Sequence, residues 1–504
     1  VGDPIAQFGR GVDARFFRDV LRDPRERDPR GYVIPVDQPD FPTATKFVNA
    51  LRHVGVDVQR ATRDFEVAGK RYGAGSYVVR AAQAFRPHVL DMFEPQDHPN
   101  DFAYPGGPPR RPYDSAGWTL AYQMGIRFDR VLDGFECPCA RIEGLASPQP
   151  RTIANANGAT GFLVSRAAND AFLAVNRLLK AGGQVYWLRS PVTANGRTHP
   201  AGTFYVAGGA DAARMLQRAA SELGISVAGT TSPPAADAVR LRPQRVALWD
   251  QYGGSMPSGW TRWLLEQYEF PFGVIFPQQI DAGDLRSKYD VIILPSGALG
   301  ERPRGGRSSQ PQAADVPAEF RHMLGRLTTE RSVPQLRRFL EAGGTVITVG
   351  SSTALAQHLG LPVANALVER TPSGGERVLP ADKFYVPGSV LRVAVDSTAP
   401  IAAGMPSRLD VFFDNSPTFR LAPDAARRGV RAVAWFDSDE PLRSGWAWGQ
   451  TYLEGGVAVA EATVGRGTLV LLGPEVTFRA QPHGTFKFLF NGIYIGTLGS
   501  GVAN

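Results

Sequence analysis

A short segment in the second half of the chain has the residue types of a nucleophile turn. Gly350, Ser351 and Ser352 follow the apolar stretch 345–349, which predicts a strand, and precede residues 353–359, which have helical periodicity. A strand–turn–helix connection of this kind lifts one side chain above the sheet. The start of the helix then offers backbone N–H groups to an oxyanion. Such a turn suits acyl chemistry, in which Ser351 or Ser352 would be the nucleophile.

A serine nucleophile needs a base within hydrogen-bond reach. His483 is the better candidate among the histidines, because His358 belongs to the same predicted helix as the turn and points elsewhere. One hypothesis is therefore a hydrolase or amidase that uses Ser351, Ser352 and His483. The alternative, which the sequence favours, is a degenerate turn that only binds a ligand or packs.

Aromatic and acidic side chains gather in two further segments and suggest ligand binding. Tyr113, Asp114 and Trp118 lie in a loop rich in Pro, Gly and Tyr, and such side chains suit a carbohydrate or a peptide. Core packing of this loop is the simpler alternative. The second segment follows the apolar strand 245–250, and its candidate ligand-binding residues are Asp250, Tyr252 and Trp260.

Groups with metal chemistry are sparse. The two cysteines, Cys137 and Cys139, are separated by one residue, and no second pair completes a zinc site. We expect two free thiols in a loop, because a bridge across one residue would be strained. The seven histidines form no H-x-x-E, H-E-x-x-H or H-x-H pattern. We therefore predict no metal site and no cofactor in this chain.

The bulk composition is that of a folded globular protein. At 504 residues with 43% hydrophobic and 20% charged residues, the chain should hold two to four domains. The net charge of +7 is dispersed, which argues against nucleic acid as a partner. No apolar run reaches the ~18 residues that span a bilayer. Because the chain begins at Val1 without Met, we expect a processed product or part of something longer.

An internal repeat dominates the first half of the chain. The pattern around Val48, Asn49 and Leu51 returns 127 positions later, and so does Gly69-Lys70-Arg71 with the Ala-Gly-Ser-Tyr that follows it. Both copies predict a helix, a strand, a tight turn and a strand. The copies share no ionisable cluster, so the repeat is more typical of architecture or a binding surface than of a catalytic centre.

The predicted fold class is α/β, with two tandem duplicated modules followed by a flavodoxin-like parallel sheet and a strand-rich tail. The predicted boundaries are a lead-in at 1–31, modules at 32–150 and 151–229, a linker at 230–241 and a domain at 242–500.

Two resemblances extend this prediction. The layout of Val291–Pro295 followed by Gly343–Gly360 resembles the class I glutamine-amidotransferase-like fold, whose members carry a nucleophilic Cys at the turn where this chain has Gly and Ser. Longer segments resemble the C-terminal half of large bacterial M14-type zinc carboxypeptidases. The segments that carry this second resemblance, over residues 30–495, are Ala74–Val79, Pro112–Leu120, Gln123–Gly125, Tyr252–Gln267, Lys288–Pro295 and Phe478–Phe486.

The second resemblance implies a function. The zinc ligands and the catalytic Glu of that family belong to an N-terminal peptidase domain, and none of them matches a position here. It therefore implies a non-catalytic accessory region for binding, positioning or assembly, with zinc only in a missing N-terminal domain. The implied partners are that peptidase domain or its cleaved fragment, with a peptide or carbohydrate as ligand. Oligomers stay possible, and the implied location is periplasmic or extracellular.

Overall fold

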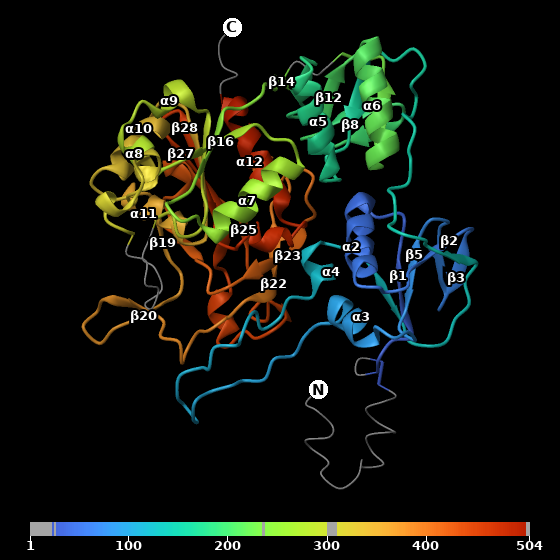
Figure 1. Ribbon diagram of the computed structural model, residues 1–504, viewed down its shortest axis with the longest axis horizontal. Helices are drawn as coiled ribbons and strands as arrows, with labels where there is room; N and C mark the ends of the chain where they lie inside the picture. The colour runs from blue at the N-terminus through green and yellow to red at the C-terminus, as the bar shows by residue number, and fades with distance from the viewer. Residues whose placement is uncertain (1–22, 25–26, 234–236, 300–309, 500–504) are drawn as a thin grey trace.

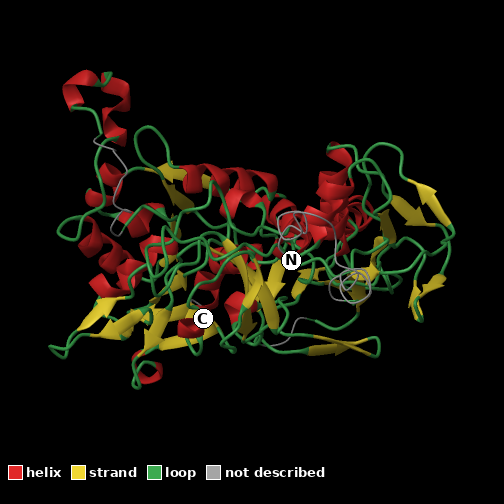
Figure 2. Ribbon diagram, turned by 90° about the horizontal axis from the view of Figure 1, so that it is seen from below, coloured by secondary structure: helices red, strands yellow, loops and turns green. Residues whose placement is uncertain are grey.

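The computed structural model describes residues 23–24, 27–233, 237–299 and 310–499. It contains two similar modules and one large sheet domain, and each of these parts combines helices with strands (Figures 1 and 2). The predicted α/β class is confirmed. Within the described ranges, no helix is both long and apolar enough to cross a membrane.

The first module is a five-stranded antiparallel sheet with the order β6-β1-β5-β2-β7. Asp40 starts its main helix by accepting a hydrogen bond from the backbone of Thr43, at 3.1 Å, which satisfies one of the free N–H groups of the first turn. The elements are β1 (Gly31–Ile34), α2 (Phe41–His53), β2 (Gln59–Ala61), β3 (Phe65–Val67), β4 (Lys70–Tyr72), β5 (Tyr77–Arg80), α3 (Arg86–Phe93), α4 (Leu120–Gln123), β6 (Asp129–Val131) and β7 (Cys139–Arg141).

The second module repeats this topology strand for strand, with the order β13-β8-β12-β9-β14. Its elements are β8 (Gly161–Val164), α5 (Asp170–Lys180), β9 (Val185–Trp187), β10 (Val192–Ala194), β11 (Arg197–His199), β12 (Phe204–Ala207), α6 (Ala210–Leu223), β13 (Val227–Thr230) and β14 (Val239–Arg240). The predicted linker at 230–241 needs a correction. Its first residue ends β13, and β14 near its end pairs with β9 at the edge of the sheet.

The large domain is built on five parallel strands with the order β16-β15-β17-β18-β28. In chain order this is 2-1-3-4-5, which is the flavodoxin-like arrangement. The strands are β15 (Val246–Trp249), β16 (Phe272–Ile275), β17 (Val291–Leu294), β18 (Thr345–Val349) and β28 (Gly467–Leu472).

Alternate residues of these strands enter two cores, one on each face of the sheet. One face packs against α7 (Met256–Gln267) and α12 (Phe486–Gly499), and the other packs against α8 (Pro277–Asp281), α9 (Leu285–Lys288), α10 (Ser332–Glu341) and α11 (Leu355–His358). The core around α12 continues into the second module, where the rings of Phe172 and Phe490 lie 5.2 Å apart. The second module and the sheet domain therefore share one core.

Antiparallel strands extend the sheet beyond β28, as the predicted strand-rich tail requires. The path continues through β27, β25, β22 and β23, with the shorter strands beside it. These strands are β19 (Val363–Asn365), β22 (Ser389–Val395), β23 (Arg408–Phe413), β24 (Phe419–Leu421), β25 (Val430–Trp435), β26 (Leu442–Ser444) and β27 (Val457–Val464). The strands β20 (Val368–Arg370) and β21 (Glu376–Val378) form a separate two-stranded hairpin.

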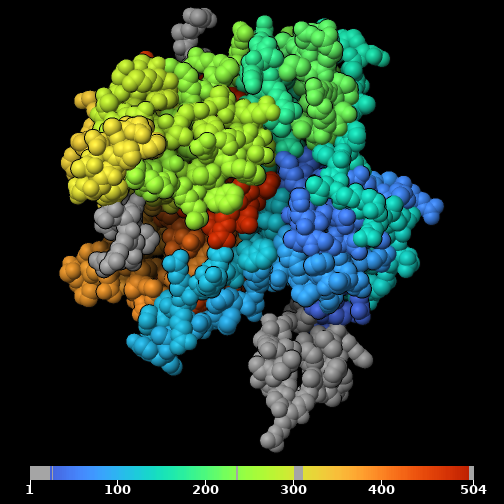
Figure 3. All heavy atoms as spheres, in the orientation of Figure 1, coloured from blue at the N-terminus to red at the C-terminus, as the bar shows by residue number. Residues whose placement is uncertain are grey.

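A long loop of the first module, residues 94–119, reaches across to the sheet domain. Figure 3 shows this light-blue segment lying against the orange and red C-terminal part. Gly445 donates its backbone N–H to Gln96 at 2.7 Å, and the hydroxyl groups of Thr119 and Ser444 lie 2.7 Å apart. Trp446 donates its indole N–H to Asn100 at 2.8 Å. The loop is thereby fixed to the sheet domain.

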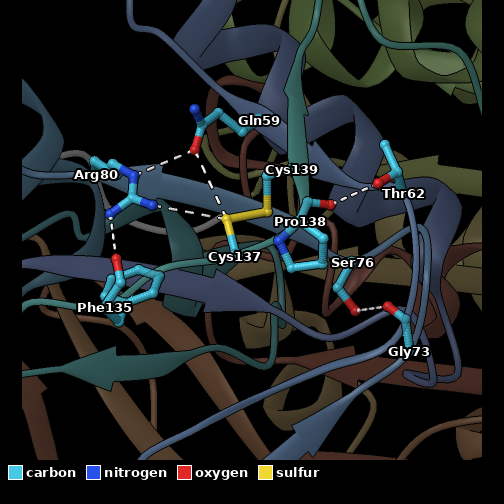
Figure 4. Close-up of a disulfide and its surroundings, with 9 residues drawn as sticks. All are labelled: Gln59, Thr62, Gly73, Ser76, Arg80, Phe135, Cys137, Pro138 and Cys139. Carbon is cyan, nitrogen blue, oxygen red and sulfur yellow. Dashed lines mark hydrogen bonds between the residues drawn. A yellow bond between two sulfur atoms is a disulfide. The ribbon is translucent and has the colours of Figure 1, made fainter.

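The two cysteines form a disulfide bond, so the prediction of two free thiols is wrong (Figure 4). The bridge joins Cys137 to Cys139 at the start of β7. The neighbouring Arg80 donates to the carbonyl of Phe135 at 2.8 Å and approaches the sulfur of Cys137 at 3.8 Å. The sequence argument rejected a bridge across one residue because of its expected strain, and the structure nevertheless has this bridge.

We expect loss of this bridge to change stability little. It closes a loop of three residues, for which the chain-entropy model gives about 1.5 kcal/mol, near the low end of the range for disulfides. The double variant Cys137→Ser/Cys139→Ser should therefore lower the midpoint of thermal unfolding by only a few degrees. The wild type measured in reducing buffer is the matched control. Failure of the variant to fold would contradict the expectation.

Candidate functional site

Four connections after parallel strands meet at the carboxyl edge of the large sheet. They follow β15, β17, β18 and β28. At or near the start of these connections lie, in the same order, Asp250, Ser296, Gly350 and Glu475. In open parallel sheets this edge is where ligands bind. The predicted nucleophile turn therefore lies in a location suited to a functional site.

The position directly after β18 is a glycine that no other residue can replace without movement. Gly350 has a φ of +55°, in the left-handed region. A Cβ atom built there would lie 2.4 Å from Oε1 of Glu475 and 2.5 Å from the hydroxyl oxygen of Ser296. Both the backbone conformation and the surrounding side chains therefore favour glycine, and the tip of the turn carries no side chain.

The two serines that follow brace the neighbouring loop. Ser351 accepts a hydrogen bond from the backbone of Gly297 at 2.9 Å and donates to the carbonyl of Leu299 at 3.2 Å. Ser352 is fully buried, accepts from the backbone N–H of Leu299 at 3.1 Å and donates to Pro295 at 2.6 Å. Both hydroxyl groups are engaged in holding the connection after β17.

The proposed base lies in another environment. The ring of His483 packs on Phe486, and its Nδ1 lies 2.9 Å from the carbonyl of Gln481. Burial, with Lys46 nearby, lowers the pKa of His483 to about 4. Within the described chain no hydrogen bond joins His483 to Ser351 or Ser352. The structure thus places the predicted catalytic residues at two separate sites.

A cavity of about 680 Å³ opens above the turn. One wall comes from the long loop of the first module, which contributes Tyr113 and Asp114, two of the predicted ligand-binding residues. Asp114 accepts two hydrogen bonds from the guanidinium group of Arg479, at 2.8 and 2.9 Å, and this pairing lowers the pKa of Asp114. The backbone of Arg479 is in the left-handed region, with a φ of 48°. This conformation is energetically unfavourable for a non-glycine residue, so the surrounding structure must hold it in place. The side chain of Tyr113 is fully exposed.

Two carboxyl groups with raised pKa values face this cavity. Burial raises the pKa of Glu475 to about 7, although Ser296 donates a hydrogen bond to it. Burial also raises the pKa of Asp414, against the opposing effect of Arg111. Near neutral pH, Glu475 is therefore present in both protonation states and can donate or accept a hydrogen bond.

A second chamber of about 510 Å³ adjoins the first, and the two share the lining residues Ser351, Tyr385, Asn415, Ser416 and Pro417. Its walls are mainly apolar, and Val378 of the β20–β21 hairpin stands at its rim with 66% of its surface exposed. The apolar side chains that line the walls include Val363, Leu367, Leu379, Phe384 and Phe419. The two chambers together offer a polar end and an apolar end.

The other predicted ligand-binding residues line neither chamber. Trp118 packs against the core of the first module. Asp250 accepts a hydrogen bond from the backbone of Gln251 at 2.8 Å, and burial raises its pKa. The remaining two lie nearby on the sheet domain: Tyr252 donates its backbone N–H to Met323, and Trp260 is 37% exposed and lies edge-to-face with Trp263.

Sequence reasoning missed four of the five charged residues that line the cavity: Arg111, Asp414, Glu475 and Arg479. Glu475 follows β28 in the segment Gly-Pro-Glu, so the rule that parallel strands end at one edge was a signal that could have found it. Asp414 follows an antiparallel strand, and no comparable signal marks it. Among the described residues, no group of three or more His, Cys, Asp or Glu side chains is arranged to hold a metal ion.

Comparison with known proteins gives no family. No protein-family model matches the chain, and no curated protein matches it. The resemblance to M14 carboxypeptidases therefore stays a prediction.

Similar solved structures include glutamine-amidotransferase-type proteins. One is a glutamine amidotransferase from Thermotoga maritima (13% identity, 51% of this chain, 96% of that chain, TM-score 0.27). Another is PurLQS from Thermotoga maritima (15% identity, 49% of this chain, 96% of that chain, TM-score 0.29). A third is a β-galactosidase from Bacillus circulans sp. alkalophilus (11%, 51%, TM-score 0.28), of which this chain covers only 31%. These TM-scores are too low for the likeness to support a conclusion about the fold or the function of this chain.

Replacement of Gly350 by Ala should destabilise the protein more than the same change at Gly360. Both glycines have positive φ values, +55° and +69°, so both variants carry a backbone cost of about 1–2 kcal/mol. Only at Gly350 does the new Cβ meet other atoms, which adds about 1–3 kcal/mol. The measurement is the unfolding midpoint of Gly350→Ala against Gly360→Ala. Equal midpoints would show that Glu475 and Ser296 do not enclose the turn.

The raised pKa of Glu475 predicts a pH dependence of stability. The folded state holds this proton more tightly than the unfolded state, so the stabilisation is complete below about pH 4.5 and is lost as the pH rises through about 7. Between pH 5 and 8 the unfolding midpoint of the wild type should therefore fall more steeply than that of Glu475→Gln. Parallel curves for the two proteins would refute this assignment.

Proposed function

We propose that this chain is a non-catalytic peptide-binding region, with its site in the two chambers at the carboxyl edge of the sheet. The observation that carries the proposal is the enclosed Gly350. The tip of the nucleophile turn bears no side chain, and the hydroxyl groups of Ser351 and Ser352 are engaged with the loop after β17. The turn thus serves to shape a cavity, and covalent catalysis has no nucleophile at its tip.

The chemistry of the chambers selects the ligand class. Carboxyl groups of Asp414 and Glu475 accept hydrogen bonds from an amino group, and Arg111 supplies donors for carbonyl oxygens. The adjoining apolar chamber takes a hydrophobic side chain. A peptide with a free amino terminus and a bulky apolar residue presents both groups together, whereas a carbohydrate lacks the apolar part. A peptide therefore fits better than a carbohydrate.

The carboxypeptidase resemblance supports the same role. Two of the segments that carry it meet at this cavity, because Asp114 belongs to one, Arg479 belongs to the other, and the two side chains form an ion pair. We extend the proposal accordingly: the region holds peptides for an M14-like peptidase domain outside this chain. In this proposal, zinc belongs to that domain and the protein is exported.

Calorimetric titration with leucyl-glycyl-glycine tests the proposal. We expect binding that is at least about tenfold weaker for the N-acetylated peptide and for triglycine, because each lacks one of the two recognised groups. Glu475→Gln should weaken binding, since it removes the charge that the amino group pairs with. Ala381→Trp at the rim of the apolar chamber should also weaken it.

The matched control is Arg218→Gln, on the exposed face of α6 and remote from both chambers. Equal affinity of all three peptides would overturn the assignment of the site. The proposal that the chain is non-catalytic would be contradicted if a serine-reactive fluorophosphonate labels the wild type and Ser351→Ala abolishes the labelling.

A further inference from the structure

The two repeats differ in whether a basic side chain at equivalent positions of their hairpins has an acidic partner. Lys70 in β4 and Arg197 in β11 are 127 positions apart and occupy the same place on the hairpins of the two modules. In the first module Lys70 pairs with Asp129 at 2.7 Å, and the hydroxyl group of Tyr72 donates to the same carboxylate at 3.2 Å. The first repeat thus carries its own counter-ion.

The strand register identifies the position equivalent to Asp129 in the second repeat. Val33 of β1 lies between Val78 and Asp129, whereas Leu163 of β8 lies between Tyr205 and Ala228. Val78 and Tyr205 are again 127 positions apart, so the two registers correspond. Ala228 therefore stands where the first repeat has Asp129.

The second repeat consequently has a cation without its counter-ion. Arg197 forms no ion pair with any residue in the described part of the chain. His199, the counterpart of Tyr72, lies beside it, and burial together with Arg197 lowers the pKa of its imidazole. The neutral ring still has one N–H group to donate. Both side chains border a space that a carboxylate fills in the first repeat.

That space is part of a cleft of about 510 Å³ between the two modules. Arg151, on the segment that joins them, also lines the cleft and is held by a hydrogen bond to the hydroxyl group of Ser226 at 2.9 Å. The carboxylate that lines the cleft, Asp37, already pairs with Arg127. The cleft therefore presents two guanidinium groups that lack a carboxylate partner among the described residues, and these outnumber the one carboxylate of its lining.

We propose that this cleft binds the oxyanion group of a small organic ligand, which takes the place that the Asp129 carboxylate holds in the first repeat. Arg197 and Arg151 supply charged donors and His199 a neutral one. Guanidinium groups recognise carboxylate, phosphate and sulfate by the same paired hydrogen bonds. The cleft is larger than a free inorganic ion needs, so the fitting ligand is an acid of about the size of a monosaccharide. None of its lining residues borders the peptide chambers.

The experiment is titration of the full chain with glucuronate, inorganic phosphate and, as the neutral probe, glucose. We expect glucuronate to bind and glucose not to bind. Arg197→Gln should weaken binding about tenfold or more, because a charge-assisted hydrogen bond is lost. Ala228→Asp should have the same effect, because it restores the counter-ion of the first repeat. The matched control is Lys70→Gln, which makes the change at the equivalent position of the first repeat and should leave binding unchanged.

The outcomes separate the sources of the oxyanion. Binding of phosphate with the same dependence on Arg197, at an affinity equal to that of glucuronate, would show that the anionic group alone is recognised, and this supports the site. Tighter binding of glucuronate supports a sugar acid. Absence of binding by either oxyanion at millimolar concentration overturns the proposal, and so does binding that Arg197→Gln leaves unchanged. The midpoint of thermal unfolding of Ala228→Asp is measured as well, to show whether this variant folds. If it does not fold, the test of the proposal rests on Arg197→Gln.

Discussion

The arrangement of the three parts depends on one buried polar junction. Lys487 of α12 is almost completely buried, and its ammonium group donates to Asn169 at 2.9 Å and lies 3.8 Å from Asp40. Asp40 in turn caps α2 and accepts a hydrogen bond from the backbone of Asn169. A charge removed from water is costly unless it is paired and hydrogen-bonded. The network therefore holds only when both modules and the sheet domain are in place together.

A second buried cation fixes the second module to the same helix. Arg166 is 3% exposed, donates to Asn491 of α12 at 2.9 Å and lies over the rings of Trp187 and Phe204. Contact with aromatic faces replaces part of the lost hydration of the guanidinium group. Because both junctions converge on α12, the modules have fixed positions relative to the sheet. That position brings the loop at 94–119 to the carboxyl edge, where it completes the cavity.

The sequence predicted those features that depend on local pattern. The repeat, the parallel strands and the turn at Gly350 all follow from apolar periodicity and glycine placement, and the structure has them. The sequence could not predict features that depend on contacts between residues far apart in the chain. The ion pair between Asp114 and Arg479 spans 365 positions, and Asp414 reaches the cavity from an antiparallel strand. His483 was preferred to His358 as the base although nothing in the sequence fixes its position, and tertiary packing places it against Phe486 at the start of α12.

The enclosed glycine explains how a turn typical of nucleophiles forms part of the wall of a cavity. A side chain at position 350 would project into the space that Glu475 and Ser296 now occupy, so the carboxyl group and a nucleophile exclude each other there. With glycine, Glu475 approaches the sheet edge closely enough for burial to hold its pKa near 7. The same close approach ties the connections after β17, β18 and β28 together. The absence of a side chain at position 350 thus leaves the space in which the Glu475 carboxyl group lies at the cavity.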